Sequence, residues 1–242
     1  MTSPGPALAA VRLTRRFATG AGVTDVSLGI APREIVALVG LNGAGKTTLM
    51  RLLLGMLRPT EGTAVLLGQT LAKIPQRTWS NIGHAIETSP GYPDLTVRRN
   101  LEISARLRGV RARQAAISVV VDEFDIGGYL SQNVRTLSMG NRQRAGLAAA
   151  LVHDPRVIVL DEPTNALDPS GVIRLRESLL RRSADGAAIL VSSHHLDEVA
   201  RFADRILVMN RGRLIGELPP HTPELEHVLF ETLRSDDAER GL

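Results

Sequence analysis

Residues 40–47 (GLNGAGKT) contain the two glycines, the lysine and the hydroxyl residue of a phosphate-binding loop at its characteristic spacing, and a third glycine lies between them. Glycine lets the backbone curl so that successive N–H groups point at phosphate oxygens, and a helix starting there adds its positive end. Lys46 is expected to reach the terminal phosphates, and the Thr47 hydroxyl to ligate Mg²⁺. The residues expected to line this cradle are Gly40, Asn42, Gly43, Ala44, Gly45, Lys46, Thr47 and Thr48. A plain glycine-rich turn is disfavoured, because the pattern lies between an expected strand and an expected helix.

A second group of candidate residues ends the apolar run at 157–162 (VIVLDE). Such a run is typical of a strand buried on both faces, and parallel sheets bind ligands beyond the carboxyl ends of their strands. Asp161 is therefore expected to hold Mg²⁺ through water, and Glu162 to polarise an attacking water molecule. By itself the pattern is weak, since an acid that merely ends a strand looks the same. Together with the loop at 40–47, the metal interpretation is favoured.

The segments that must position these residues alternate between strand and helix patterns. A continuous apolar strand at 35–39 leads into the loop, and helical spacing follows at 46–57. Two N-terminal segments, 9–13 and 23–30, read as antiparallel strands. The other expected elements are strands at 157–160, 188–191, 205–209 and around 214, a mainly helical stretch at 96–152, and helices at 170–182 and 224–233. This order predicts an α/β fold with a mostly parallel sheet covered on both faces and a helical arm inserted into it.

Composition narrows the class of protein. Of the 242 residues, 43% are hydrophobic and 22% charged, as in ordinary globular domains. We find no signal-peptide pattern, no cysteine and no run near the about 20 apolar residues of a membrane-spanning helix, so we expect a soluble, intracellular protein. The sequence pI is about 10.2, but the net charge is only +4 and arginines are interleaved with acids. No nucleic-acid partner is therefore expected.

Three further segments and one aromatic residue resemble those of one family. Residues 137–144 (LSMGNRQR) are similar to the signature of the ATP-binding subunits of ABC transporters, which usually has the sequence LSGGQ. Residues 163–168 (PTNALD) resemble the D-loop, and residues 192–194 (SSH) the switch-histidine segment. Phe17 matches the aromatic residue that stacks on adenine. Because these motifs occur in family order over residues 13–217, their combination is far more specific than any one of them.

The resemblance implies a P-loop NTPase with a RecA-like core, an N-terminal antiparallel β subdomain and a helical subdomain at about 87–150. The ATP-binding domain would span 1–218, and a short helix and tail 219–242. Two copies of the ATP-binding subunit, or this chain and a related one, would form a head-to-tail dimer around two ATP molecules. Ser138 and Gly140 would bind the γ-phosphate held by the partner's loop, and His194 would contact it in its own site. Asp168 is counted among the nucleotide-binding residues.

Departures from the family pattern refine this expectation. Met139 and Asn141 stand where the signature usually has glycine and glutamine. Glu87 replaces the usual glutamine that touches Mg²⁺ and faces the membrane subunit, and it is taken here as a metal-site candidate. This acid, followed by residues 90–93 (PGYP), resembles the branch that exports peptide antibiotics such as bacitracin and lantibiotics. The expected location is the inner face of the cell membrane, on a transmembrane subunit of a separate chain.

Other classes of ATPase share some of these motifs. A soluble ATPase of the ABC type that drives assembly of a cytosolic complex, such as an iron–sulfur scaffold, would carry all of them and stays open as an alternative. DNA-repair and chromosome ATPases need long heptad arms for which residues 46–135 leave no room, and translation factors of this superfamily have two such domains. A GTP switch requires an Asn-Lys-x-Asp motif, and neither Lys46 nor Lys73 follows an asparagine. The favoured prediction is an exporter ATPase subunit.

Overall fold

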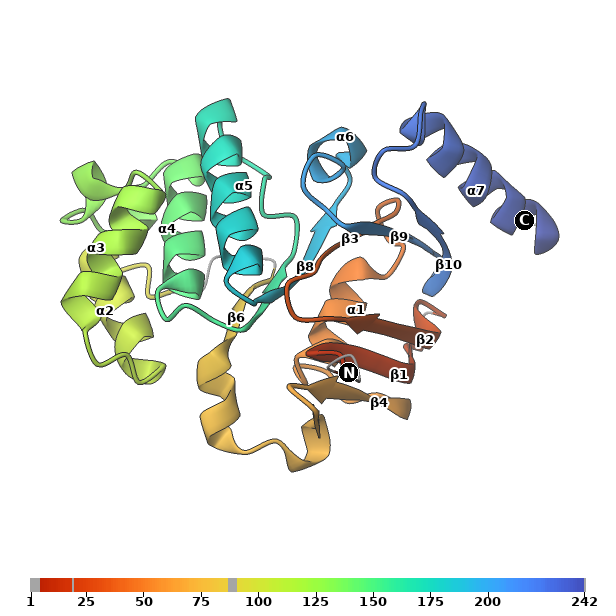
Figure 1. The fold of residues 1–242 in the computed structure, drawn as a ribbon, viewed down its shortest axis with the longest axis horizontal. Coiled ribbons are helices and arrows are strands. Elements are labelled where there is room, and N and C mark those ends of the chain that lie inside the picture. Colours follow the sequence, from red (N-terminus) through yellow and green to blue (C-terminus); the bar gives the residue numbers. More distant parts are fainter. Residues whose placement is uncertain (1–4, 19, 87–90, 242) are drawn as a thin grey trace. The chain divides into compact units, whose positions relative to one another are not determined.

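The computed structural model describes residues 5–18, 20–86 and 91–241 of the chain, in an α/β fold (Figure 1). Contacts group the residues into two compact units. The first comprises Met1–Ile74 and Ala188–Leu242, and the second comprises Pro75–Ala187. The second unit exceeds the helical arm expected at 87–150, because it also includes two strands and one further helix.

An antiparallel sheet in the first unit holds the N-terminal strands. Its order is β2-β1-β4-β5. The strands are β1 (Leu8–Arg16), β2 (Gly22–Ile30), β4 (Glu61–Leu66) and β5 (Gln69–Thr70). The segments expected at 9–13 and 23–30 pair with each other as predicted.

Parallel strands of the first unit surround β3 (Ile35–Val39). β3 pairs in parallel with β8 (Ala188–Ser193) on one side and β9 (Arg205–Asn210) on the other, and β10 (Arg213–Leu218) joins β9 antiparallel. Every residue of β3 is buried, as expected for a strand covered on both faces. The carboxyl ends of β3 and β8 therefore meet at one edge of the sheet, where the phosphate-loop pattern begins.

The helices of the first unit differ in length from those expected. They are α1 (Lys46–Leu53), α6 (Leu196–Val199) and α7 (Leu225–Glu239), with a 3₁₀ turn at Leu71–Lys73. α1 ends before residue 57, because the chain turns at Gly55 with φ +67°. α7 continues beyond the expected end at 233, into residues that read as a polar tail. Its Leu225 and Leu233 are buried in a cluster with residues of β3, α6 and β9.

The second unit joins a short parallel strand pair to a group of helices (Figure 1). β6 (Ile82–Ala85) pairs in parallel with β7 (Val157–Leu160). The helices are α2 (Val97–Leu107), α3 (Arg113–Glu123), α4 (Met139–Leu151) and α5 (Pro169–Ala184), with 3₁₀ turns at Gln76–Asn81, Gly127–Tyr129 and Val134–Thr136. α4 approaches β6 so closely that an added Cβ at Gly83 would lie 2.6 Å from the carbonyl oxygen of Ala150.

A histidine lies between α4 and β7, against the backbone of β6. The Nε2 atom of His153 is 3.1 Å from the carbonyl oxygen of Ile82. Within the described part of the chain, its buried Nδ1 atom has no hydrogen-bond partner. Burial lowers the pKa of His153 to about 4, and the positive charge of Arg108 acts in the same direction. The ring is therefore neutral near pH 7, with Nε2–H donating to Ile82.

We expect His153 to make the fold sensitive to mild acid. Its folded pKa is below the ordinary 6.5, so the unfolded chain takes up the proton more readily between pH 6.5 and 4, and lowering the pH favours unfolding. After allowance for partial exposure, the free energy of unfolding should fall by about 1–2 kcal/mol from this group between pH 7 and pH 5. Urea unfolding at both pH values, on the unaltered chain and on His153→Gln, measures the difference. An equal loss in the two proteins would contradict the assignment.

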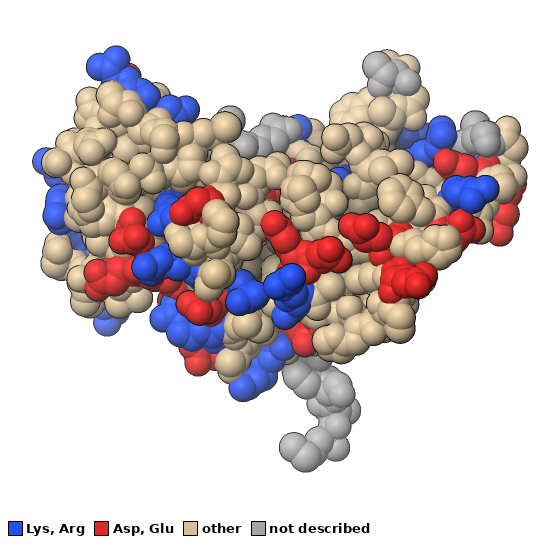
Figure 2. All heavy atoms as spheres, turned by 90° about the horizontal axis from the view of Figure 1, so that it is seen from above, with Lys and Arg blue, Asp and Glu red and all other residues tan. Residues whose placement is uncertain are grey.

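The surface carries both signs of charge. Figure 2 shows basic and acidic side chains lying close to one another in the middle and lower part of the face that it draws, in agreement with the interleaving of charges along the sequence. Among the helices of the described residues, none is both long enough and apolar enough to span a bilayer.

Candidate functional site

The phosphate-loop pattern at 40–47 connects β3 to α1, as its motif requires. Lys46 opens α1, and only 7% of its surface is exposed. Its ammonium group donates a hydrogen bond to the carbonyl oxygen of Gly40 at 2.7 Å. The loop therefore closes on itself, and a positive charge is held against the curled backbone that follows β3.

Close approach of β9 explains why this loop contains glycine. An added Cβ at Gly40 would overlap the carbonyl oxygen of Met209. Gly45 has φ +105°, and its Cβ would lie 3.0 Å from the Met209 methyl carbon and 3.1 Å from the carbonyl oxygen of Gly22. Gly43 has φ +83°, with open space around it. Two of the three glycines are thus fixed by packing, and the third by backbone conformation.

Strand register places His194 at the same sheet edge as the loop. Val39, the last residue of β3, lies opposite Ser193, the last residue of β8. Gly40 and His194 are the residues that follow them. The His194 side chain is exposed, and its ring centroid is 3.9 Å from that of His195. The first unit therefore brings together the loop and the predicted switch histidine.

Four other predicted nucleotide ligands of the first unit are at least partly exposed. Phe17 follows β1 and is 36% exposed, and the guanidinium carbon of Arg15 lies 5.4 Å from its ring centroid, a cation–π distance. Asn42 is exposed in the loop. Thr47 and Thr48 are half-buried in the first turn of α1. An aromatic ring with an exposed surface suits stacking, and hydroxyl groups at a helix N-terminus suit phosphate or Mg²⁺ ligands.

The predicted catalytic carboxylates lie in the second unit, at the end of β7. The Asp161 N–H donates to the carbonyl oxygen of Ala85 at 2.8 Å, which extends the parallel pairing by one residue. Glu162 has φ +47°, a left-handed backbone conformation that residues other than glycine rarely adopt. Both residues, together with Met139 and Asn165, line a cavity of about 910 Å³. The sheet therefore presents two adjacent acids to an open space that the start of α4 also borders.

The start of α4 is held against the segment that follows these acids. Ser138 caps the helix, accepting a hydrogen bond from the N–H of Asn141 at 3.3 Å. An added Cβ at Gly140 would lie 2.7 Å from the carbonyl oxygen of Ala166. Met139 is 73% exposed. The side chain of Met139, which departs from the signature, is thus exposed to solvent. Gly140, which the signature retains, lies where there is no room for a side chain.

A family model described as ABC transporter matches residues 23–165. The chain belongs to the ABC transporter family. The ABC transporter ATP-binding protein YhcH of Bacillus subtilis (strain 168), described as uncharacterized, is 37% identical over 195 residues, which cover 80% of this chain and 63% of YhcH. The bacitracin transport ATP-binding protein BcrA of Enterococcus faecalis is 37% identical over 210 residues, covering 85% of this chain and 67% of BcrA.

A solved structure described as the ATP-binding subunit of an ABC transporter has a TM-score of 0.84 and 26% identity to this chain. The match covers 95% of this chain and 98% of that one. The ABC transporter ATP-binding domain and its P-loop NTPase fold are therefore confirmed, as is the predicted likeness to the bacitracin branch. The chain spans only about two thirds of the length of these two curated relatives, 63% of YhcH and 67% of BcrA.

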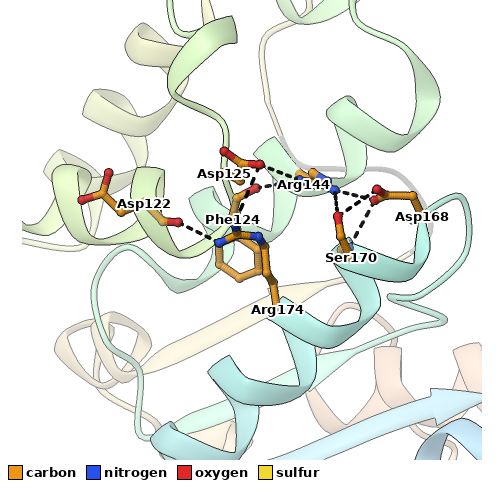
Figure 3. A network of polar contacts seen from close by, with 8 residues as sticks. Asp122, Phe124, Asp125, Arg144, Asp168, Ser170 and Arg174 are labelled. Atoms are coloured by element: carbon orange, nitrogen blue, oxygen red, sulfur yellow. Dashed lines mark hydrogen bonds and ion pairs between the residues drawn. The ribbon is translucent and has the colours of Figure 1, made fainter.

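In this ABC domain, Asp168 lies in a polar network that the sequence did not reveal (Figure 3). It caps α5 by accepting from the N–H of Gly171 at 3.2 Å, and it also bonds the guanidinium of Arg144 and the hydroxyl of Ser170. Arg144 is almost fully buried in α4 and donates to the carbonyl oxygen of Phe124. The hydrogen bond from Arg144 lowers the pKa of Asp168 to about 2. The D-loop acid therefore stays ionised and ties α4 to α5.

Arg144 was not predicted from the sequence, and one predicted site residue lies outside the described part of the chain. Arg144 directly precedes the small and apolar residues 145–151 of α4, and an arginine at the border of a buried helix face is the signal that could have identified it. Glu87, the predicted substitute for the family's glutamine, lies outside the described residues. The first unit contains the loop and His194, and the second contains Asp161, Glu162, Ser138, Gly140 and Asp168.

Proposed function

We propose that this chain binds ATP with Mg²⁺, hydrolyses ATP and thereby drives a membrane subunit on a separate chain that exports a peptide antibiotic or another drug. The observation that carries the proposal is the closed phosphate loop with the buried Lys46 ammonium on Gly40. In a chain that belongs to the ABC transporter family, that loop is the nucleotide cradle. The relative BcrA, named for bacitracin transport, supports the class of cargo. Neither YhcH nor BcrA is named for the assembly of a cytosolic complex, so these relatives give the assembly ATPase no support.

The predicted metal ligands have the chemistry that Mg²⁺ prefers. Thr47 offers a hydroxyl and Asp161 a carboxylate, and hard oxygen ligands are what Mg²⁺ prefers. Among the described residues, no three acidic or histidine side chains form a metal cluster. This suits Mg²⁺ held by one or two protein oxygens together with phosphate oxygens, rather than by a cage of carboxylates. Bound there, Mg²⁺ would neutralise charge that develops on the phosphates.

The proposed roles follow from the chemistry of each group. Lys46 and the loop N–H groups bind the β- and γ-phosphates, and the ring of Phe17 stacks on adenine. Glu162 accepts the proton of the attacking water, while His194 contacts the γ-phosphate and orients that water. A second copy of the subunit supplies Ser138 and Gly140 to the γ-phosphate, and the exposed N-terminus of α4 suits such a contact.

The proposed partner and location are tested by purification. The chain would be tagged in its native host, the membranes solubilised gently, and the co-purifying proteins identified. We expect a polytopic membrane protein in stoichiometric amount, retained in ATP-free buffer and absent from a tagged cytosolic control. Recovery of the chain only from the soluble fraction, alone or with a soluble partner, would overturn the exporter proposal.

A further inference from the structure

The turn between β9 and β10 contacts the phosphate loop directly. The N–H of Gly212 donates to the carbonyl oxygen of Ala44 at 2.7 Å, and the carbonyl oxygen of Gly212 accepts from the N–H of Thr24 at 2.8 Å. An added Cβ at Gly212 would overlap the carbonyl oxygen of Gly22. The turn is therefore bonded to the loop and to β2 at a position that admits only glycine.

The bond from Gly212 sets the direction of the next N–H group in the loop. The peptide between Ala44 and Gly45 is planar and trans, so the Ala44 carbonyl and the Gly45 N–H point in opposite directions. With the carbonyl held by Gly212, the Gly45 N–H is directed away from the turn. Gly45 is the N-cap of α1, and N–H groups at a helix N-terminus serve as anion ligands. The turn thus orients one donor of the phosphate cradle.

Strand alternation directs the neighbouring side chain toward α7. Met209 approaches the loop, and its methyl carbon would be 3.0 Å from a Cβ on Gly45. Asn210 follows, and successive strand residues face opposite sides. Asn210 is 5% exposed, and its side-chain amide donates to Asp236 at 2.8 Å and to Asp237 at 3.0 Å. One strand end therefore touches the phosphate loop with one residue and the C-terminal helix with the next.

Asp237 also holds the strained residue of the turn. Arg211 and Gly212 have φ +43° and φ +81°, the positive values that a two-residue type I′ hairpin turn requires. For arginine this left-handed conformation is unfavourable, because the Cβ atom lies close to the following carbonyl oxygen. The Arg211 Nε atom lies 3.0 Å from the Asp237 carboxylate that also accepts from Asn210. A single carboxylate on α7 therefore stabilises both residues that precede Gly212.

We propose that Asp237 is a positioning residue for nucleotide binding: through Asn210 and Arg211 it holds the β9–β10 turn, and the turn orients the Ala44–Gly45 peptide of the phosphate loop. α7, which lies along β10 in Figure 1, is then a control element of the loop as well as a cover for the core. Any movement of α7 away from the turn lowers the affinity for ATP. The inference rests on the proposed function in that the loop at 40–47 must bind ATP.

The test is Asp237→Ala in the full chain, with Mg²⁺ and a fluorescent ATP analogue as the probe. We expect the Kd for the analogue and the KM for ATP to rise about fivefold or more, with kcat unchanged, because the lost contact acts on binding rather than on chemistry. Asp237→Glu, which keeps a carboxylate, should recover part of the affinity. If Asp237→Ala does not fold, the milder Asp237→Asn replaces it.

Glu231→Ala is the matched control, an exposed acid on the same helix whose ion pair is with Arg234 on that helix. It should leave the Kd unchanged. A lower unfolding temperature for Asp237→Ala with an unaltered Kd would overturn the inference and leave Asp237 as an anchor of α7 only. Lys46→Ala separates the two proposals: if it retains full ATP affinity, the proposed function itself fails, whatever the Asp237 variants do.

Discussion

Replacing Glu162 with glutamine is expected to reduce ATP hydrolysis by about 10²–10⁴-fold, the usual contribution of a general base. Glu162 follows the buried strand β7 and lines the cavity that Met139 and Asn165 also border. The amide has nearly the same shape as the carboxylate but cannot take a proton from water. ATP binding should persist, since the phosphate contacts assigned to Lys46 are untouched. The ATP-bound dimer should therefore accumulate.

Two measurements on the purified chain check this result. Phosphate release gives the turnover, and size-exclusion chromatography with and without ATP gives the dimer. The matched control is Glu177→Gln, which removes the same charge from an exposed position on α5 in the same unit. It should behave as the unaltered chain does. Wild-type turnover in Glu162→Gln would show that another group accepts the proton.

The phosphate loop and the β7 acids could be predicted from sequence because each motif lies within one strand–loop–helix segment. The glycines, Lys46 and the first turn of α1 form contiguous structure, so residue types at fixed spacing determine their geometry. The antiparallel pairing of β1 and β2 also followed, since it joins neighbouring segments. Such features depend on local conformation and on hydrophobic periodicity, which the chain displays directly.

Features that depend on distant segments could not be predicted. The end of α7 read as a polar tail because its large apolar residues stop at Leu233, yet the helix continues to Glu239. Asp236 and Asp237 bond Asn210, which lies more than twenty residues earlier. The Arg144–Asp168 pair likewise joins two helices. In both cases polar side chains find partners through the fold, and no periodicity along the chain encodes that choice.

Lys46→Ala is expected to weaken ATP binding by about a hundredfold. The ammonium is buried on the Gly40 carbonyl, and a charge-assisted contact with phosphate of this kind contributes about 3 kcal/mol, or about two decades of Kd. The chain contains only one other lysine, Lys73. The loop therefore has no second lysine that could take over the role of Lys46. Titration with a fluorescent ATP analogue in the presence of Mg²⁺ measures the loss directly.

Lys73→Ala provides the control, because Lys73 is exposed at the end of the 3₁₀ turn Leu71–Lys73 in the same unit as the loop. It removes the same charge without touching the cradle, and its Kd should equal that of the unaltered chain. Equal weakening in both variants would mean that net charge, rather than the closed loop, attracts the nucleotide. Salt separates these causes further, since screening weakens long-range attraction between exposed charges much more than a contact at a buried ammonium. The difference between the two variants should therefore persist at high ionic strength.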